Sequence, residues 1–190
     1  MPSTAIDLFC GIGGLTKGLS LSGITVQAGI DIDDSCLFAY EKNNNAQFIN
    51  CDITSLQGEQ LEALYPDNTI RILVGCAPCQ PFSKYTNRYR KDGPTDDKWK
   101  LLYSFARLVQ EVNPEIISME NVPELESKKV FADFVSTLKE LNYYVDWKIV
   151  YCPEYGVPQN RKRLVLLASR LGEIKLIPPL YDSEHYPTVR

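Results

Sequence analysis

The feature that most constrains the fold is a regular alternation of short apolar runs with amphipathic segments along the chain. The apolar runs are short and rich in β-branched or aromatic residues, which favours strands. We expect strands at 4–9, 25–30, 47–50, 70–74, 115–119, 144–151 and 163–168. We expect helices between them at 14–21, 34–43, 56–65, 97–112 and 129–141.

Strands that alternate with helices build a mostly parallel sheet with helices on both faces. No helix is predicted between the last two strands, so we expect the last strand to return antiparallel to its neighbour. The sequence therefore predicts an α/β fold with an antiparallel last strand. In open sheets of this type ligands bind at the carboxyl ends of the parallel strands, and the start of an antiparallel last strand reaches the same edge.

The composition is that of a globular protein. With 190 residues, 44% of them hydrophobic, we expect residues 1–190 to form a single domain. No apolar run is long enough to span a membrane and the first residues lack the features of a signal peptide, so we expect a cytoplasmic protein with no membrane partner. The net charge of −4 argues against an extended nucleic-acid surface supplied by this chain alone.

One segment could still contact nucleic acid. Residues 83–100 interleave lysine and arginine with tyrosine and tryptophan, a mixture that can bind phosphates and stack on bases. The aspartates in the same segment weaken this interpretation. A solvated loop explains the segment equally well.

Cys79 lies in a Pro-Cys-Gln-Pro turn directly after the predicted strand at 70–74. Pro78 and Pro81 restrict the backbone on both sides, which places the thiol at the strand end. A reactive cysteine and an ordinary packing cysteine both fit this position. Cys76 and Cys79 also form a Cys-x-x-Cys pair, but zinc would need about two more ligands. We therefore expect no metal, while a redox role stays open.

A glycine-rich turn after the first predicted strand indicates a nucleoside-type cofactor. Residues 9–14 read Phe-Cys-Gly-Ile-Gly-Gly, and Asp31 follows at the end of the second strand. Glycines allow a tight turn, and a carboxylate at that distance can accept hydrogen bonds from a ribose. Asp52, after the third strand, can accept from an exocyclic amine or cap a helix. Ile32 and Ile53 offer apolar surfaces to a ring.

Charged residues follow two further strands. Glu120 comes at the end of an apolar strand, where a carboxylate is costly without a partner, so it is a candidate acid. A residue turned to solvent is the alternative. Arg161 and Arg163 are two residues apart at the start of the last strand, so we expect them to share one face, toward the cleft. An ordinary basic turn would account for them as well.

These motifs, in this order and spacing, resemble the catalytic domain of the DNA cytosine-5 methyltransferases. The matching segments are 7–14, 31, 52–53, 78–80, 120–122 and 159–163. The resemblance covers nearly the whole chain. It implies a Rossmann-like fold of the S-adenosylmethionine-dependent methyltransferases, with a mostly parallel seven-stranded sheet. The residue after Asp31, often aromatic in the family, is Ile32 here.

The resemblance implies methyl transfer from S-adenosyl-L-methionine to C5 of a cytosine in DNA, with S-adenosyl-L-homocysteine as product. Cys79 would add to C6 of a cytosine flipped out of the duplex, and Glu120 would hold or protonate N3. Arg163 would bind O2 and Arg161 would brace the site, while segment 83–100 would close over the base. The cofactor would contact Phe9, Gly11, Ile12, Gly13, Gly14, Asp31, Ile32, Asp52, Ile53, Pro78 and Leu101.

The resemblance implies that members of this family continue into a target-recognition domain and a return segment, and we expect this chain to lack both. We therefore expect an exposed apolar patch, an unfinished cofactor pocket and a complementary chain or segment as partner. The chain would be one half of a split enzyme, a truncated gene product or a deliberately shortened chain. Two alternatives stay open: the same chemistry on transfer RNA, as in a related branch, and a catalytically silent partner-binding subunit.

Overall fold

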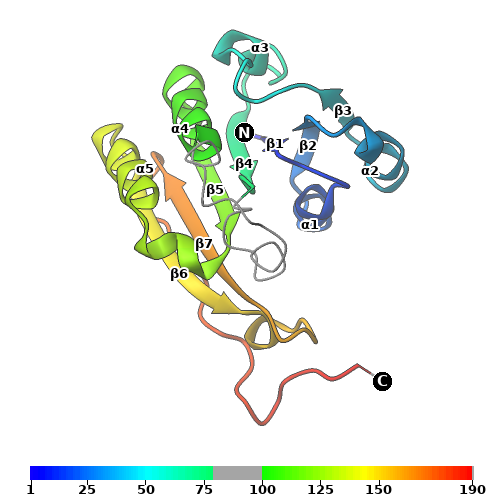
Figure 1. Ribbon diagram of the computed structural model, residues 1–190, viewed down its shortest axis with the longest axis vertical. Coiled ribbons are helices and arrows are strands. Elements are labelled where there is room, and N and C mark those ends of the chain that lie inside the picture. The colour runs from blue at the N-terminus through cyan, green and yellow to red at the C-terminus, as the bar shows by residue number, and fades with distance from the viewer. Residues whose placement is uncertain (79–99, 190) are drawn as a thin grey trace, which may run out of the picture.

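The computed structural model describes residues 1–78 and 100–189, which contain one seven-stranded sheet (Figure 1). The strands are β1 (Ser3–Leu8), β2 (Thr25–Asp31), β3 (Gln47–Asn50), β4 (Ile70–Gly75), β5 (Ile116–Asn121), β6 (Tyr144–Tyr151) and β7 (Lys162–Ser169). The α-helices are α1 (Gly14–Leu21), α2 (Leu37–Asn43), α3 (Gly58–Glu62), α4 (Lys100–Val112) and α5 (Lys129–Glu140). Short 3-10 turns are η1 (Asp34–Cys36), η4 (Pro123–Ser127) and η5 (Cys152–Tyr155).

The strand order is β3-β2-β1-β4-β5-β7-β6. The first five strands are parallel to one another, whereas β7 inserts antiparallel between β5 and β6. The predicted fold class, including the antiparallel last strand, is confirmed. None of the described helices is long and apolar enough to cross a membrane.

Three predicted boundaries are wrong for local reasons. Phe9 is not part of β1, because its φ of 59° turns the chain into the glycine loop. The helix predicted at 34–43 begins as a 3-10 turn, in which Asp33 accepts a hydrogen bond from the Ser35 amide. The helix predicted at 56–65 is helical only over Gly58–Glu62. Its flanking residues Leu56 and Tyr65 are buried without being helical, so their apolar spacing resembled a longer helix.

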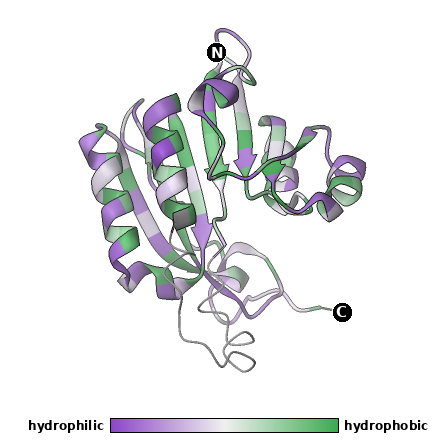
Figure 2. Ribbon diagram, turned by 45° about the horizontal axis from the view of Figure 1, so that its top comes forward, coloured by the Kyte–Doolittle hydropathy of each residue, from purple (hydrophilic) through white to green (hydrophobic). Residues whose placement is uncertain are grey.

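The main hydrophobic core lies between the sheet and α3, α4 and α5 (Figure 2). Helix α4 supplies much of it, since Phe105, Leu108 and Val109 are fully buried. The ring of Phe105 packs on Phe134 of α5 with centroids 5.5 Å apart. Each such buried side chain stabilises the fold by about 1.5–3 kcal/mol. This core fixes α4 and α5 on one face of the sheet.

The opposite face is covered less completely. Helix α1 packs Leu15 and Leu19 against a small core that includes Ile72 and Val74 of β4. Helix α2 covers β2 and β3 through Tyr40, which is fully buried. No described helix covers this face over β5, β7 and β6 (Figure 1). The side chains of β5, β7 and β6 that point to this face are therefore half-buried or exposed.

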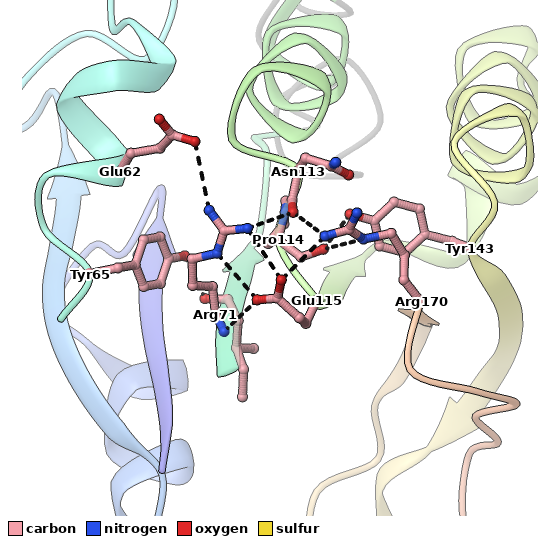
Figure 3. Close-up of polar contacts among 9 residues, drawn as sticks. Glu62, Tyr65, Arg71, Asn113, Pro114, Glu115, Tyr143 and Arg170 are labelled. Atoms are coloured by element: carbon pink, nitrogen blue, oxygen red, sulfur yellow. Dashed lines mark hydrogen bonds and ion pairs between the residues drawn. The ribbon is translucent and has the colours of Figure 1, made fainter. Parts of the chain in front are cut away.

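At the edge where the parallel strands begin and β7 ends, two arginines share the carboxylate of Glu115 (Figure 3). Arg71 of β4 donates its backbone amide and its Nε to Oε2, at 2.8 and 3.2 Å. Arg170, directly after β7, places Nη2 3.3 Å from Oε1. Burial raises the pKa of Glu115, but the hydrogen bonds from Arg71 lower it. As a result, the pKa of Glu115 lies below its ordinary value. The three residues join β4, β5 and β7 at one edge.

Three buried polar side chains form a hydrogen-bonded network where β1 ends. Asp7 is 1% exposed, and its Oδ2 accepts a hydrogen bond of 2.7 Å from the hydroxyl of Thr16 on α1. The Thr16 hydroxyl also lies 3.1 Å from the hydroxyl of Tyr40 on α2. Burial raises the pKa of Asp7 to about 7, although the Thr16 hydrogen bond acts in the opposite direction. This network joins β1, α1 and α2 beneath the glycine turn.

Replacement of Asp7 by asparagine should remove a pH dependence of stability. Because the folded-state pKa of about 7 lies above the unfolded value near 4, the folded protein binds more protons between these limits. The free energy of unfolding should therefore fall as the pH rises from 4 to 7, by up to about 1.4 kcal/mol per pH unit from Asp7. Urea unfolding across this range should show a shallower decline for Asp7→Asn. Equal slopes would contradict the burial effect.

Candidate active site

A pocket of about 220 Å³ lies at the carboxyl ends of the strands, beside the start of α4. It has apolar walls and two carboxylates. The lining residues are Phe9, Asp31, Ile32, Asp52, Ile53, Thr54, Pro78 and Leu101. All of these except Thr54 were predicted from the sequence to contact a cofactor, and the structure brings them together around one cavity.

The predicted glycines shape the loop between β1 and α1 rather than the wall of the pocket. Gly11 and Gly13 have φ angles of +49° and +85°, which side-chain-bearing residues rarely adopt. A Cβ on Gly13 would overlap the Asn44 amide and come within 2.8 Å of the Tyr40 ring. Gly14 begins α1, and Ile12 at the tip of the loop is 65% exposed. The loop therefore leaves its backbone accessible beside the pocket.

Backbone donors orient the Asp31 carboxylate. Oδ2 accepts from the Gly11 amide at 2.8 Å, and Oδ1 accepts from the Asp33 amide at 3.0 Å. The Asn50 side chain donates to the carbonyls of Asp31 and Ile32, which holds the ends of β2 and β3 together. A carboxylate oxygen can accept more than one hydrogen bond, so both oxygens can still receive ligand hydroxyls.

Asp52 uses one oxygen in its own turn. Its Oδ1 accepts from the Thr54 amide at 2.8 Å, which closes the turn after β3. Asp52 does not cap a helix, because α3 starts only at Gly58 and is capped by Gln57. The helix-cap alternative for Asp52 is therefore wrong. Its carboxylate lines the pocket opposite apolar side chains.

A second polar cluster lies at the ends of β4, β5 and β7. Glu120 of β5 pairs with Arg163 of β7, with Nε 2.6 Å from Oε1. Its other oxygen, Oε2, lies 2.8 Å from Sγ of Cys76, which follows β4. The neighbouring Asn121 is buried and donates its side-chain amide to the carbonyl of Ala77 at 2.9 Å. The segment after β4 is thus attached to β5 by two adjacent side chains.

The two other predicted catalytic residues are Arg161 and Cys79. Arg161 is exposed and precedes β7, which begins at Lys162. Of the two arginines only Arg163 belongs to the strand, and the Arg161 carbonyl accepts a hydrogen bond of 2.9 Å from the Cys152 amide. Cys79 lies outside the described residues, as does the segment 83–99.

Sequence reasoning missed several residues that the structure places at the site. Thr54 had a signal, since a threonine two residues after Asp52 is typical of a hydrogen-bonded turn. Cys76 was considered only as part of a Cys-x-x-Cys pair. Within residues 1–78 and 100–189, no cluster of three or more acidic, cysteine or histidine side chains could hold a metal. The contact between Cys76 and Glu120 had no sequence signal, because the residues are far apart in the chain.

The sheet order, the glycine turn and the acid at the end of β2 together define the Rossmann-like fold of the S-adenosylmethionine-dependent methyltransferases. The chain belongs to the C-5 cytosine-specific DNA methylase family, whose model matches residues 3–188. The Dnmt2 methyltransferase of S. pombe has the same fold, with a TM-score of 0.74 and 22% identity over 93% of this chain and 52% of that one. The Entamoeba histolytica methyltransferase EhMeth gives a TM-score of 0.71 and 26% identity over 90% and 53%.

Among curated proteins, the chain is similar to Type II methylases. It is 53% identical to the Type II methylase M.HgiDII of Herpetosiphon aurantiacus over 100% of this chain and 53% of the relative. It is 33% identical to the Type II methyltransferase M.SsoII of Shigella sonnei over 90% of this chain and 43% of the relative. The chain therefore spans about half the length of the curated relatives it matches.

Two neighbouring glycines of the loop should respond oppositely to the same substitution. Gly13→Ala should lower the free energy of unfolding by about 2–4 kcal/mol, because the left-handed backbone and the overlap with Asn44 and Tyr40 both penalise a methyl group. Gly14→Ala is the matched control, since it has ordinary helical geometry and no atom within 4 Å of the added Cβ. It should be neutral or slightly stabilising in urea unfolding. Equal losses would mean that neither the backbone angle nor the overlap at Gly13 sets the cost.

Proposed function

We propose that this chain is the catalytic part of an enzyme that transfers a methyl group from S-adenosylmethionine to C5 of cytosine in DNA. The observation that carries the proposal is the position of residues 76–78. Pro78 lines the pocket, Cys76 contacts Glu120, and Cys79 comes next in the chain. The segment that carries the thiol therefore connects the pocket with the Glu120–Arg163 pair.

The pocket suits an adenosine-type cofactor. Asp31 is oriented by backbone amides to receive ribose hydroxyls, and Asp52 can accept from an exocyclic amine. Ile53, Phe9 and Leu101 provide apolar contacts for a ring. When bound, S-adenosylmethionine supplies an electrophilic methyl group.

The chain's own residues would activate the cytosine. The thiolate of Cys79 forms a bond to C6, and the electron pair of the C5–C6 double bond becomes available at C5 for attack on the methyl group. Glu120 hydrogen-bonds or protonates N3, which draws charge away from C6, and Arg163 is near enough to Glu120 to contact O2 of the same ring. Loss of the C5 proton and expulsion of the thiolate then release 5-methylcytosine. A stacked base is out of reach of the thiol, so the cytosine must leave the duplex.

Cys79→Ser should abolish methyl transfer, because a serine hydroxyl is almost entirely protonated near neutral pH and is a far weaker nucleophile than a thiolate. We would join the chain to the part of M.HgiDII that lies beyond the match and measure transfer of labelled methyl groups. The substrates are duplex DNA and transfer RNA. Wild type should methylate DNA and form a covalent adduct with DNA containing 5-fluorocytosine, whereas Cys79→Ser should do neither.

The same assay separates the alternatives. Transfer to transfer RNA alone would replace DNA as the substrate, and no transfer to either polymer would favour a catalytically silent subunit. An adduct that survives Cys79→Ser would contradict the assignment of the nucleophile. Cys152→Ala is the control, because this half-buried cysteine lies in η5 and should leave activity unchanged.

Asp31→Asn should weaken cofactor binding by tenfold or more, on the order of the loss expected when a hydrogen bond to a charged group is removed. Titration calorimetry of S-adenosylhomocysteine into the 190-residue chain measures this affinity without requiring activity. Asp34→Asn is the matched control, since Asp34 is an exposed acid of η1 that does not line the pocket. Equal affinities for the two variants would contradict the role of Asp31.

A further inference from the structure

The carboxyl group of Glu120 has two chemically different partners. Arg163 binds Oε1 through an ion pair of 2.6 Å, and the Cys76 thiol contacts Oε2 at 2.8 Å. The side chains of Glu120 and Arg163 are only 30% and 20% exposed. The terminal torsion of a glutamate is otherwise broad and weakly restricted. With both oxygens engaged, the plane of the carboxyl group is set jointly by the thiol and the guanidinium.

The fold explains why Cys76 reaches this position. The pairing of β4 with β5 ends at Gly75 and Met119, so Cys76 and Glu120 are the next residues along and face the same side of the sheet. Gly75 permits β4 to approach β1 closely, since a Cβ there would lie 3.0 Å from the Leu8 carbonyl. The Cys76 amide donates to that carbonyl at 3.4 Å. The backbone that carries the thiol is therefore held by its neighbouring strand.

The two partners differ in strength. A guanidinium is charged and donates through a rigid fork, so its bond to a carboxylate is among the strong hydrogen bonds in proteins. A thiol is a weak donor. Replacing the Cys76 thiol at Oε2 by a ligand atom therefore costs less free energy than replacing the Arg163 guanidinium at Oε1. The geometry singles out Oε2 as the oxygen of Glu120 that an incoming group can take over.

We propose that Cys76 is a positioning residue for Glu120. Its thiol orients Oε2 toward N3 of the cytosine and yields this oxygen to the ring when the base binds. The inference rests on the proposed function, because it assumes that a cytosine is the group that takes over Oε2. Cys76 itself forms and breaks no covalent bond.

The contact is tested on the isolated chain by infrared spectroscopy, independently of activity. The S–H stretching band shifts to lower frequency when a thiol donates a hydrogen bond, and a difference spectrum between wild type and Cys76→Ala identifies the contribution of Cys76. In Glu120→Ala this contribution should move to higher frequency. A Cys76 band that is unchanged in Glu120→Ala would overturn the proposal.

The positioning role is tested by kinetics in the joined, active protein. Cys76→Ala removes the donor that orients Oε2 before the base binds, so it should lower kcat/KM for DNA by about tenfold, the scale of one hydrogen bond to a charged group, with the KM for S-adenosylmethionine unchanged. Cys76→Ser should restore kcat/KM for DNA to within about threefold of wild type, because a hydroxyl is a better donor than a thiol and stays within hydrogen-bond reach of Oε2. Cys152→Ala is the matched cysteine control and should retain the wild-type kcat/KM for DNA.

The outcomes separate this inference from the proposed function. Active wild type with an equally active Cys76→Ala refutes the positioning role and leaves methyl transfer intact. Loss of activity in both Cys76→Ala and Cys76→Ser, with normal binding of S-adenosylhomocysteine, would also refute it, because restoration by a donor is its specific consequence. An inactive wild type whose Cys76 band responds to Glu120→Ala refutes the proposed function and with it the catalytic meaning of the contact.

Discussion

The carboxylate of Glu115, shared by Arg71 and Arg170, is the interaction on which the geometry of the site depends. Together with the backbone ladders between these strands, it joins β4, β5 and β7 at the edge where β5 begins and β7 ends. Glu115, directly before β5, and Glu120 are five residues apart, a span of roughly 16 Å in extended chain. The backbone ladders of β5 with β4 and β7 therefore place Glu115 at one edge of the sheet and Glu120 beside residues of β4 and β7 at the opposite edge.

At the open edge, the same strand ends serve two regions. Pro78 lines the pocket in which we expect the cofactor, whereas Cys76 and Ala77 contact Glu120 and Asn121. A short segment of extended backbone thus couples the pocket to the cluster in which we expect base activation. The antiparallel β7 is essential to this arrangement, because only its start reaches that edge and provides Arg163 for Glu120. The face of β5, β7 and β6 opposite α4 and α5 has no covering helix within the described residues.

Periodicity determined much of the fold. Every predicted strand is present, because short runs rich in β-branched or aromatic residues and bounded by turn residues favour strands. The helix bounds were wrong where residues are buried without being helical. Leu56 and Tyr65 have helical spacing but pack as loop residues, and the insertion of β7 between β5 and β6 follows from long-range pairing that no local pattern encodes.

The sequence by itself determined which residue types occur at the strand ends, and for this family their order is informative enough to predict Asp31, Asp52, Glu120 and Arg163 as site residues. Only the tertiary structure decided which of them meet. The Arg163 ion pair and the Cys76 contact join residues 43 and 44 positions from Glu120. These contacts depend on strand register and on the strands being joined by Glu115, Arg71 and Arg170 at the opposite edge. The physical reason is that a side chain's type is local, whereas its partner is chosen by packing across the whole sheet.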